Sequence, residues 1–179
     1  MKHDPIPDQP VIETDRFVLR PLRPSDAGLI EFYASDARVA RMTTSIPHPL
    51  PPGTIEAFIE RAIDPARDAD VWAIDGTRHG APEVMGLIEL ARLDRGQSEV
   101  SFWVAPAHWN TGVASQALAA LIAENPQDSR TFFASVFQDN AASARLLTNT
   151  GFRYLGDAES YCPARGATVP IWTYSRNRD

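Results

Sequence analysis

Cysteine and long apolar runs are nearly absent from this sequence, and each absence excludes a class of protein. Cys162 is the only cysteine, so no disulfide can form within the chain and a disulfide-stapled secreted scaffold is excluded. No stretch approaches the roughly 18 consecutive apolar residues of a membrane-spanning helix. The polar, proline-rich start lacks the apolar core of a signal peptide. We therefore expect a cytoplasmic protein that does not enter a membrane.

Positive charge is also scarce and dispersed. Lys2 is the only lysine, and 17 basic residues against 23 acidic ones give a net charge of −6. Binding to a phosphate backbone needs concentrated positive charge, so we expect no nucleic-acid partner. An acidic surface instead favours the approach of a cationic ligand such as an amine. His3, His48, His79 and His108 lack the spacing of metal ligands, and we expect no metal site.

The length of 179 residues suits one domain. Residues 1–10 predict a flexible N-terminal tail, and no linker or repeat divides residues 11–179. Hydrophobic periodicity predicts a mixed α/β domain with the element order βααβββαβαββ, in which Pro170 favours a late start or an edge position for the last strand. The expected strands are 16–22, 71–74, 84–90, 99–104, 131–137, one that begins with 152–155, and 169–174. The expected helices contain 29–33, 55–63, 112–124 and 140–150.

The segment after the strand 99–104 has the composition of an anion-binding turn. It leads into a helix whose first turn carries only small or uncharged side chains, so its unpaired backbone N–H groups are accessible. Gly112 and Ala114 allow a phosphate to approach the backbone, and Thr111 and Ser115 add hydroxyl groups. The same residues also fit an ordinary connection in which glycine permits tight packing. Spacing alone leaves both interpretations open.

Residues 108–117 resemble the pyrophosphate-binding signature of the GNAT acetyltransferases, in the form that their RimJ/RimL-like branch uses. Trp109, Gly112 and Ala114 match that signature. Three further segments are similar to the branch and occur in its order, namely 13–20, 99–104 and 140–152. The four segments together extend the resemblance over nearly the whole chain.

The resemblance implies a mostly antiparallel sheet of six to seven strands flanked by helices, with splayed central strands that form an acetyl-CoA cleft. It implies an N-acetyltransferase with acetyl-CoA as cosubstrate. The acetyl group would pass directly, in a ternary complex, to a primary amine of a protein N-terminus or of a small molecule. The alternatives are an acyltransferase that uses another acyl-CoA and a catalytically degenerate module that binds acyl-CoA or regulates another protein. Dimers are common among relatives, so the oligomeric state is either a monomer or a homodimer.

The resemblance also implies roles for individual residues. Glu99 is the candidate general base, with a solvated strand charge as the alternative. Ser143 is the candidate proton donor to the thiol, and Asn140 either contacts the cofactor arm or caps a helix. The implied cofactor-binding residues are Trp103, Val104, Trp109, Asn110, Thr111, Gly112, Val113, Ala114, Ser115 and Asn140, with a backbone N–H near Trp103 and Val104 facing the developing oxyanion.

The sequence departs from the family pattern at several positions. Asn110 and Thr111 stand where Gly-Lys is common, so the pyrophosphate loses a nearby cation and depends on backbone amides and the Thr111 hydroxyl. Thr148 stands where many members carry a tyrosine proposed as general acid. Residues 42–50 are expected, by analogy with the family, to form one wall of the acceptor site. Cys162 has no paired histidine nearby, which favours a buried cysteine over a nucleophile.

Overall fold

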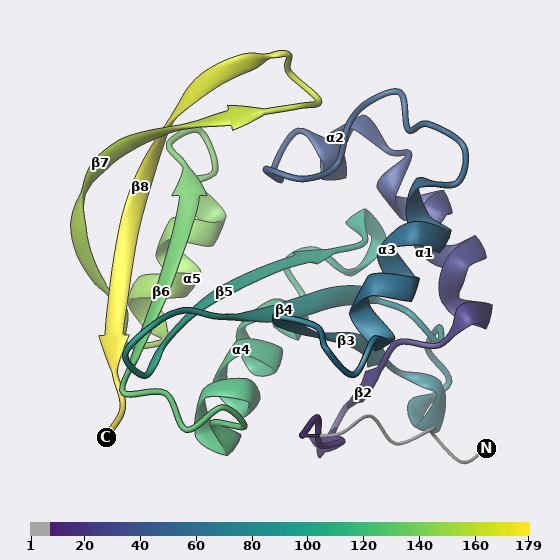
Figure 1. Ribbon diagram of the computed structural model, residues 1–179, viewed down its shortest axis with the longest axis horizontal. Helices are drawn as coiled ribbons and strands as arrows, with labels where there is room; N and C mark the ends of the chain where they lie inside the picture. The colour runs from purple at the N-terminus through teal and green to yellow at the C-terminus, as the bar shows by residue number, and fades with distance from the viewer. Residues whose placement is uncertain (1–7) are drawn as a thin grey trace.

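Eight strands form one sheet of order β1-β2-β3-β4-β5-β6-β8-β7, counted over residues 8–179, the part of the chain that the computed structural model describes (Figure 1). Every neighbouring pair is antiparallel except β5 and β6, which run parallel. The strands are β1 (Ile12–Glu13), β2 (Val18–Pro21), β3 (Ala69–Asp75), β4 (Gly86–Arg92), β5 (Gln97–Val104), β6 (Thr131–Phe137), β7 (Arg153–Cys162) and β8 (Ala167–Asn177).

Five α-helices and three short 3-10 helices connect these strands within the described residues. The α-helices are α1 (Ala27–Ala34), α2 (Ala37–Ala40), α3 (Thr54–Ile63), α4 (Val113–Glu124) and α5 (Ala141–Asn149), and the 3-10 helices are η1 (Pro24–Asp26), η2 (Thr77–His79) and η3 (Pro106–His108). Over residues 8–179, no helix combines the length and the apolar character that a membrane crossing requires.

The predicted α/β class and mostly antiparallel sheet are confirmed, but the predicted count of six to seven strands is wrong. The additional strand is β1, which pairs with β2 through only two residues. Helix α2 was also not predicted, and it has four residues. Elements this short leave no periodic pattern in a sequence, so hydrophobic periodicity could not reveal them.

The hairpin of β7 and β8 extends well beyond the residues that the sequence pattern indicates. β7 continues to Cys162 and β8 begins at Ala167, and the mostly exposed side chains of β7 give no apolar alternation to detect. β8 lies between β6 and β7, so the expectation of a late or edge strand at Pro170 is wrong. Pro170 is tolerated because it stands just beyond the last β6–β8 pair, Phe137 with Ile171.

The end of the predicted N-terminal tail is attached to the sheet. Residues 1–7 of that prediction lie outside the described part of the chain. Gln9 is buried, and its Nε2 donates to the carbonyl oxygen of Val71 at 2.7 Å. Trp72 Nε1 donates to the carbonyl oxygen of Pro10 at 2.8 Å. These two bonds attach the end of the predicted tail to β3.

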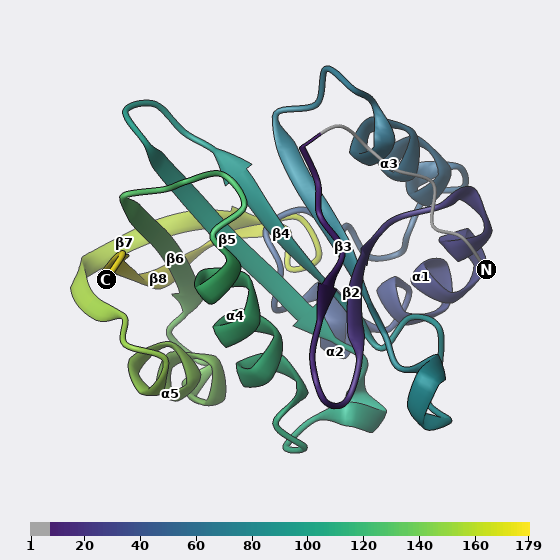
Figure 2. The same ribbon diagram turned by 90° about the horizontal axis from the view of Figure 1, so that it is seen from below.

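Helices cover both faces of the sheet (Figure 2). On one face, α4 and α5 contribute Leu118, Leu121 and Leu147 to a core shared with the strands. On the other face, α1 and α3 contribute Ile30 and Ile59 to a second core. Successive side chains of a strand point to opposite faces, so neighbouring residues of the central strands β4 and β5 alternate between the α4–α5 layer and the α1–α3 layer.

A buried arginine joins β2, η1 and β3. Arg20 is fully buried, and its Nε lies 2.7 Å from Asp75, while its two terminal nitrogens bond Asp26 at 2.9 and 2.8 Å. Carbonyl oxygens of Pro21 and Glu83 accept its remaining hydrogens at 3.1 and 3.2 Å. Burial lowers the pKa of Arg20, but the hydrogen bonds to Asp26 and Asp75 together raise it by more than burial lowers it. The pKa of Arg20 is therefore above its usual value. All five guanidinium donors are therefore satisfied.

Replacing Asp26 with asparagine should destabilise the fold by about 3 kcal/mol, because it leaves the buried Arg20 charge with one fewer counter-ion. Urea unfolding at neutral pH measures the change. Asp128→Asn is the matched control, since Asp128 forms an exposed ion pair with Arg178 that should add almost nothing to stability. A loss in Asp26→Asn no larger than in the control would contradict this role of the network.

Candidate active site

The sheet separates into two halves between β5 and β6. These parallel strands share only three residue pairs, Gln97–Glu99 with Thr131–Phe133. Beyond Glu99, β5 continues in register with β4 as far as Val104, and β6 continues with β8 as far as Phe137. The divergence is visible in Figure 1. The predicted splay of the central strands is therefore confirmed, and it leaves a strand edge without a strand partner.

Backbone groups of Phe102 and Val104 face this opening. The backbone N–H of Ala105 donates to the Met85 carbonyl, just before β4, at 2.9 Å. The Trp103 carbonyl oxygen also points toward β4, since a Cβ placed on Gly86 would lie only 2.3 Å from it. The backbone groups of Ala105 and Trp103 therefore face β4. Backbone groups alternate in direction along an antiparallel strand, which turns those of Phe102 and Val104 the other way. Of the two residues predicted to supply the N–H group, Val104 therefore faces the opening.

One group on this edge already has a partner. Trp109 Nε1 donates to the Val104 carbonyl oxygen at 2.7 Å, and the Arg38 guanidinium lies 5.8 Å from the centre of the Trp109 ring. The Trp103 side chain lies in the α1–α3 layer, where its ring meets that of Tyr33 edge-on at 6.4 Å. Trp103 thus supports the site through packing, whereas Trp109 covers the end of the open edge.

Glu99 and Ser101 project from β5 on the α1–α3 face, opposite Val100 and Phe102, as the alternation in the sequence predicts. Glu99 is exposed and belongs to the last residue pair before β5 and β6 diverge. Within the described residues its carboxylate has no hydrogen bond or ion pair in the structure. Glu99 is therefore placed at the apex of the opening with its oxygens available.

Glu89 is a second carboxylate on this face, and the sequence analysis missed it. It pairs with Ser101 across β4 and β5, and Ala91 pairs with Glu99, so the two carboxylates are diagonal neighbours. Burial raises the pKa of Glu89, and the charges of Glu99 and Asp68 raise it further. A glutamate inside the otherwise apolar run 84–90 was the available signal.

The turn before α4 is open to an anion. Gly112 has a φ of 82° and Asn110 a φ of 61°, and the bond from Gln116 N–H to the Gly112 carbonyl at 3.0 Å begins the helix. The N–H groups at positions 113–115 therefore have no partner within the helix. A Cβ at Gly112 would have only one neighbour within 4 Å, Arg16 Nη1 at 3.4 Å. The space beside Gly112 is thus bounded by backbone and by the guanidinium of Arg16.

The two hydroxyl groups predicted to assist at this turn bond the protein itself. The Thr111 hydroxyl donates to the His108 carbonyl, and the Ser115 hydroxyl donates to the Gly112 carbonyl at 3.2 Å. Both bonds brace the turn. The backbone N–H groups are therefore the donors that the turn presents outward, with Val113 buried beneath them and Ala114 half-buried.

Asn140 and Ser143 stand at the start of α5, directly after β6. Asn140 Oδ1 accepts a bond from Ser143 N–H at 3.3 Å, which confirms the helix-cap interpretation of Asn140. Its Nδ2 and the Ser143 hydroxyl have no bonds to other described residues. Because parallel strands end at the same edge of a sheet, the helix starts after β5 and β6 lie at one edge of the opening.

The tip of the β7–β8 hairpin connects the two sides of the opening. Arg165 bonds Asp139 through two nitrogens at 2.6 and 3.1 Å, and its Nε donates to the Arg41 carbonyl at 2.9 Å. Hydrogen bonding to Arg165 holds the pKa of Asp139 below its usual value. Cys162 is fully buried beside this tip, and its Sγ lies 3.3 Å from the Thr43 carbonyl oxygen. The predicted acceptor wall, residues 42–50, is thereby anchored next to α5.

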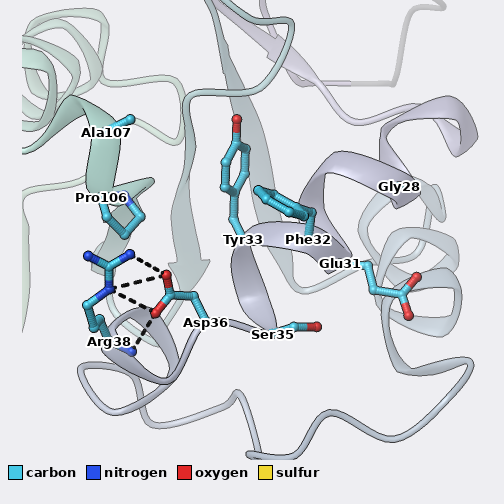
Figure 3. A pocket seen from close by; sticks show the side chains of 9 residues that line it. All are labelled: Gly28, Glu31, Phe32, Tyr33, Ser35, Asp36, Arg38, Pro106 and Ala107. Atoms are coloured by element: carbon cyan, nitrogen blue, oxygen red, sulfur yellow. Dashed lines mark hydrogen bonds and ion pairs between the residues drawn. The ribbon is translucent and has the colours of Figure 1, made fainter.

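A cavity of about 660 Å³ lies between α1, α2 and the turn after β5 (Figure 3). Phe32 and Tyr33 form its apolar wall, and Asp36 and Arg38 face each other across its floor through bonds of 2.7 to 3.3 Å. No residue from 42–50 lines it. Across residues 8–179, no group of three or more His, Cys, Asp or Glu residues could hold a metal ion.

Comparison with known proteins identifies the arrangement. The family described as "Acetyltransferase (GNAT) domain" matches residues 16–153. The uncharacterized N-acetyltransferase YoaA of Bacillus subtilis is 29% identical over 176 residues, covering 93% of this chain and 96% of YoaA. The ribosomal α-N-protein acetyltransferase RimL, solved with coenzyme A, superposes with a TM-score of 0.82 at 16% identity, over 95% of this chain and 99% of RimL.

A spermidine N-acetyltransferase from Vibrio cholerae, solved with coenzyme A and spermine, superposes with a TM-score of 0.77 at 14% identity, over 92% of this chain and 97% of that enzyme. RimL and the spermidine enzyme thus share the fold of this chain, although one is a protein acetyltransferase and the other a spermidine acetyltransferase. The fold alone does not select between a protein N-terminus and a polyamine.

Replacing Glu89 with glutamine should raise the melting temperature at pH 8 and change it less at pH 5. A carboxyl group whose pKa is raised in the folded state contributes its stability at low pH and loses it as pH rises through the folded pKa. Glutamine removes the charge that causes this loss. Thermal unfolding between pH 5 and pH 8 measures the difference. Glu159→Gln, on the exposed strand β7, is the control, and a gain independent of pH would contradict the assignment.

Proposed function

Because this chain belongs to the GNAT acetyltransferase family, we propose that it transfers an acetyl group from acetyl-CoA to a primary amine in a ternary complex. The observation that carries the proposal is the juxtaposition of the open strand edge of β5 with the uncovered first turn of α4. We further assign the chain to the RimJ/RimL-like branch, which the four matching segments support, and treat residues 11–179 as one catalytic domain.

The residues at the opening fit an acyl-CoA. A phosphate needs several convergent N–H donors, which positions 113–115 provide beside a glycine without a side chain. The pantetheine arm contains amides, and an unpaired strand edge provides the complementary groups at Phe102 and Val104. Asn140 Nδ2 is available from the other side, and Trp109 and Asn110 flank the turn. Acetyl-CoA supplies the acetyl group as a thioester.

Glu99 is assigned as the general base. An alkyl amine is mostly protonated at neutral pH and must lose a proton before it becomes a nucleophile. Glu99 is exposed on the α1–α3 face at the apex of the opening, so it can accept that proton directly or through water. Glu89 adds negative charge to the same face, which favours a cationic acceptor.

The remaining steps use groups on both sides of the opening. Backbone N–H groups of Phe102 and Val104 are the donors available to the thioester oxygen as its charge develops. The Ser143 hydroxyl, near the start of α5, is assigned to relay a proton to the departing sulfur, and it takes up a replacement proton from water. Residues 42–50 would form the acceptor wall. Thr148, which stands where many family members carry a tyrosine, is not assigned as a proton donor, because its hydroxyl donates to the Ala144 carbonyl at 3.1 Å inside α5.

The proposal is tested by thiol release from acetyl-CoA in the presence of small amines, polyamines and peptides with free N-termini. Release that depends on one class of acceptor, with a mass gain of one acetyl group on that acceptor, is the expected result. A larger acyl-CoA serves as the control for acyl-group choice. Tight binding of acetyl-CoA with no acceptor-dependent release would instead support a binding or regulatory module and contradict the enzymatic proposal.

Replacing Glu99 with glutamine should lower kcat by about 100-fold or more and leave the Kd for acetyl-CoA nearly unchanged. The pH–rate profile is the decisive readout, because loss of the base should remove the rise in rate with pH that its ionisation produces. Glu159→Gln should leave both constants unchanged. An unaltered profile in Glu99→Gln would show that another group accepts the proton.

A further inference from the structure

A guanidinium stands beside the turn where the family signature has a lysine and this chain has Thr111. Arg16 lies between β1 and β2, and its Nη1 donates to the Thr111 carbonyl oxygen at 2.7 Å. The same nitrogen is 3.4 Å from the position that a Cβ on Gly112 would occupy. These residues are separated by 95 positions in the sequence, so no local pattern reveals the contact.

The backbone that carries Arg16 is held firmly. Thr14 N–H and its hydroxyl donate to the Phe17 carbonyl at 2.9 and 2.8 Å, and the Thr14 hydroxyl oxygen accepts the N–H of Phe17 at 3.1 Å. The Phe17 side chain is buried in the core that α4 shares. A tight turn anchored against the same core therefore fixes the base of the Arg16 side chain relative to α4.

The charge of Arg16 is available to a ligand. Its side chain is exposed, and over residues 8–179 it forms no ion pair with a carboxylate. One carbonyl oxygen occupies only one of its five donors. Arginine presents paired donors that match two oxygens of a phosphate, and such charge-assisted bonds are stronger than neutral ones. The open N–H groups at positions 113–115 lie at the same turn.

We propose that Arg16 binds the diphosphate of acetyl-CoA and supplies the positive charge that Thr111 cannot. This inference rests on the proposed function, because it requires acyl-CoA at the turn before α4. Arg16 approaches the turn from the β1–β2 side, whereas the family lysine would extend from the turn itself. The loss of lysine at position 111 is then compensated by a residue from another part of the fold.

Calorimetric titration with coenzyme A tests the proposal without any need for turnover. Arg16→Gln should weaken binding by about tenfold, since it removes a charged hydrogen-bonding partner. Arg16→Lys should retain most of the affinity, and adding Thr111→Lys to Arg16→Gln should restore it by returning a cation to the turn. The affinity of the unchanged protein should also fall more steeply with salt than that of Arg16→Gln.

Two controls separate the proposed contact from other effects of charge. Arg178→Gln makes the same change in net charge near the C-terminus and should leave binding unaltered. Dephospho-coenzyme A keeps the diphosphate but lacks the 3′-phosphate, so Arg16→Gln should weaken its binding to the same degree. If only coenzyme A is affected, Arg16 contacts the 3′-phosphate and the diphosphate assignment is overturned.

The remaining outcomes are also decisive. Equal affinity in Arg16→Gln and the unchanged protein would overturn the inference and leave the proposed function intact. Equal weakening in Arg16→Gln and Arg16→Lys, without recovery on adding Thr111→Lys, would show that Arg16 only supports the Thr111 carbonyl. Absence of coenzyme A binding in the unchanged protein would reject the proposed function together with this inference. Melting temperatures of all variants establish that each one is folded.

Discussion

The separation of β5 from β6 is the constraint on which the rest of this structure depends. Each strand is fully paired on its outer side, β5 with β4 and β6 with β8, while the two share only three residue pairs. Backbone groups on the inner edge therefore lack strand partners, and such groups favour an amide-rich ligand. Because β5 and β6 are parallel, the helices that follow them begin at the same edge. One topological feature thus places Gly112, Asn140 and the free edge together.

Electrostatic character differs between the two faces around this opening. On the α4 side, unpaired helix N–H groups and Arg16 favour an anion. On the α1–α3 side, Glu89 and Glu99 favour a cation, and their mutual proximity contributes to the raised pKa of Glu89. The division suits a reaction between an anionic cosubstrate and a protonated amine. Arg165 links the two sides of the opening, because it joins the tip of the β7–β8 hairpin to Asp139, just before α5, and to the Arg41 carbonyl, just before the predicted acceptor wall.

Local patterns in the sequence were sufficient for much of this arrangement. The expected strand 99–104 coincides with most of β5, and the small, uncharged residues at the start of the helix 112–124 predicted its open first turn. The residues that the sequence analysis missed depend on long-range pairing. Arg16 meets Thr111 only because β1, β2 and α4 share a core, and Glu89 meets Glu99 only through the register of β4 and β5. The Arg165 contacts require the full length of a hairpin whose exposed β7 carries no apolar signal.

A crystal structure of the protein with coenzyme A bound would test the central claim most directly. The account predicts diphosphate oxygens within hydrogen-bonding distance of the N–H groups at positions 113–115, and the thiol between β5 and β6 near Glu99 and Ser143. Coenzyme A bound elsewhere, with the turn before α4 and the β5 edge both free of it, would contradict the account.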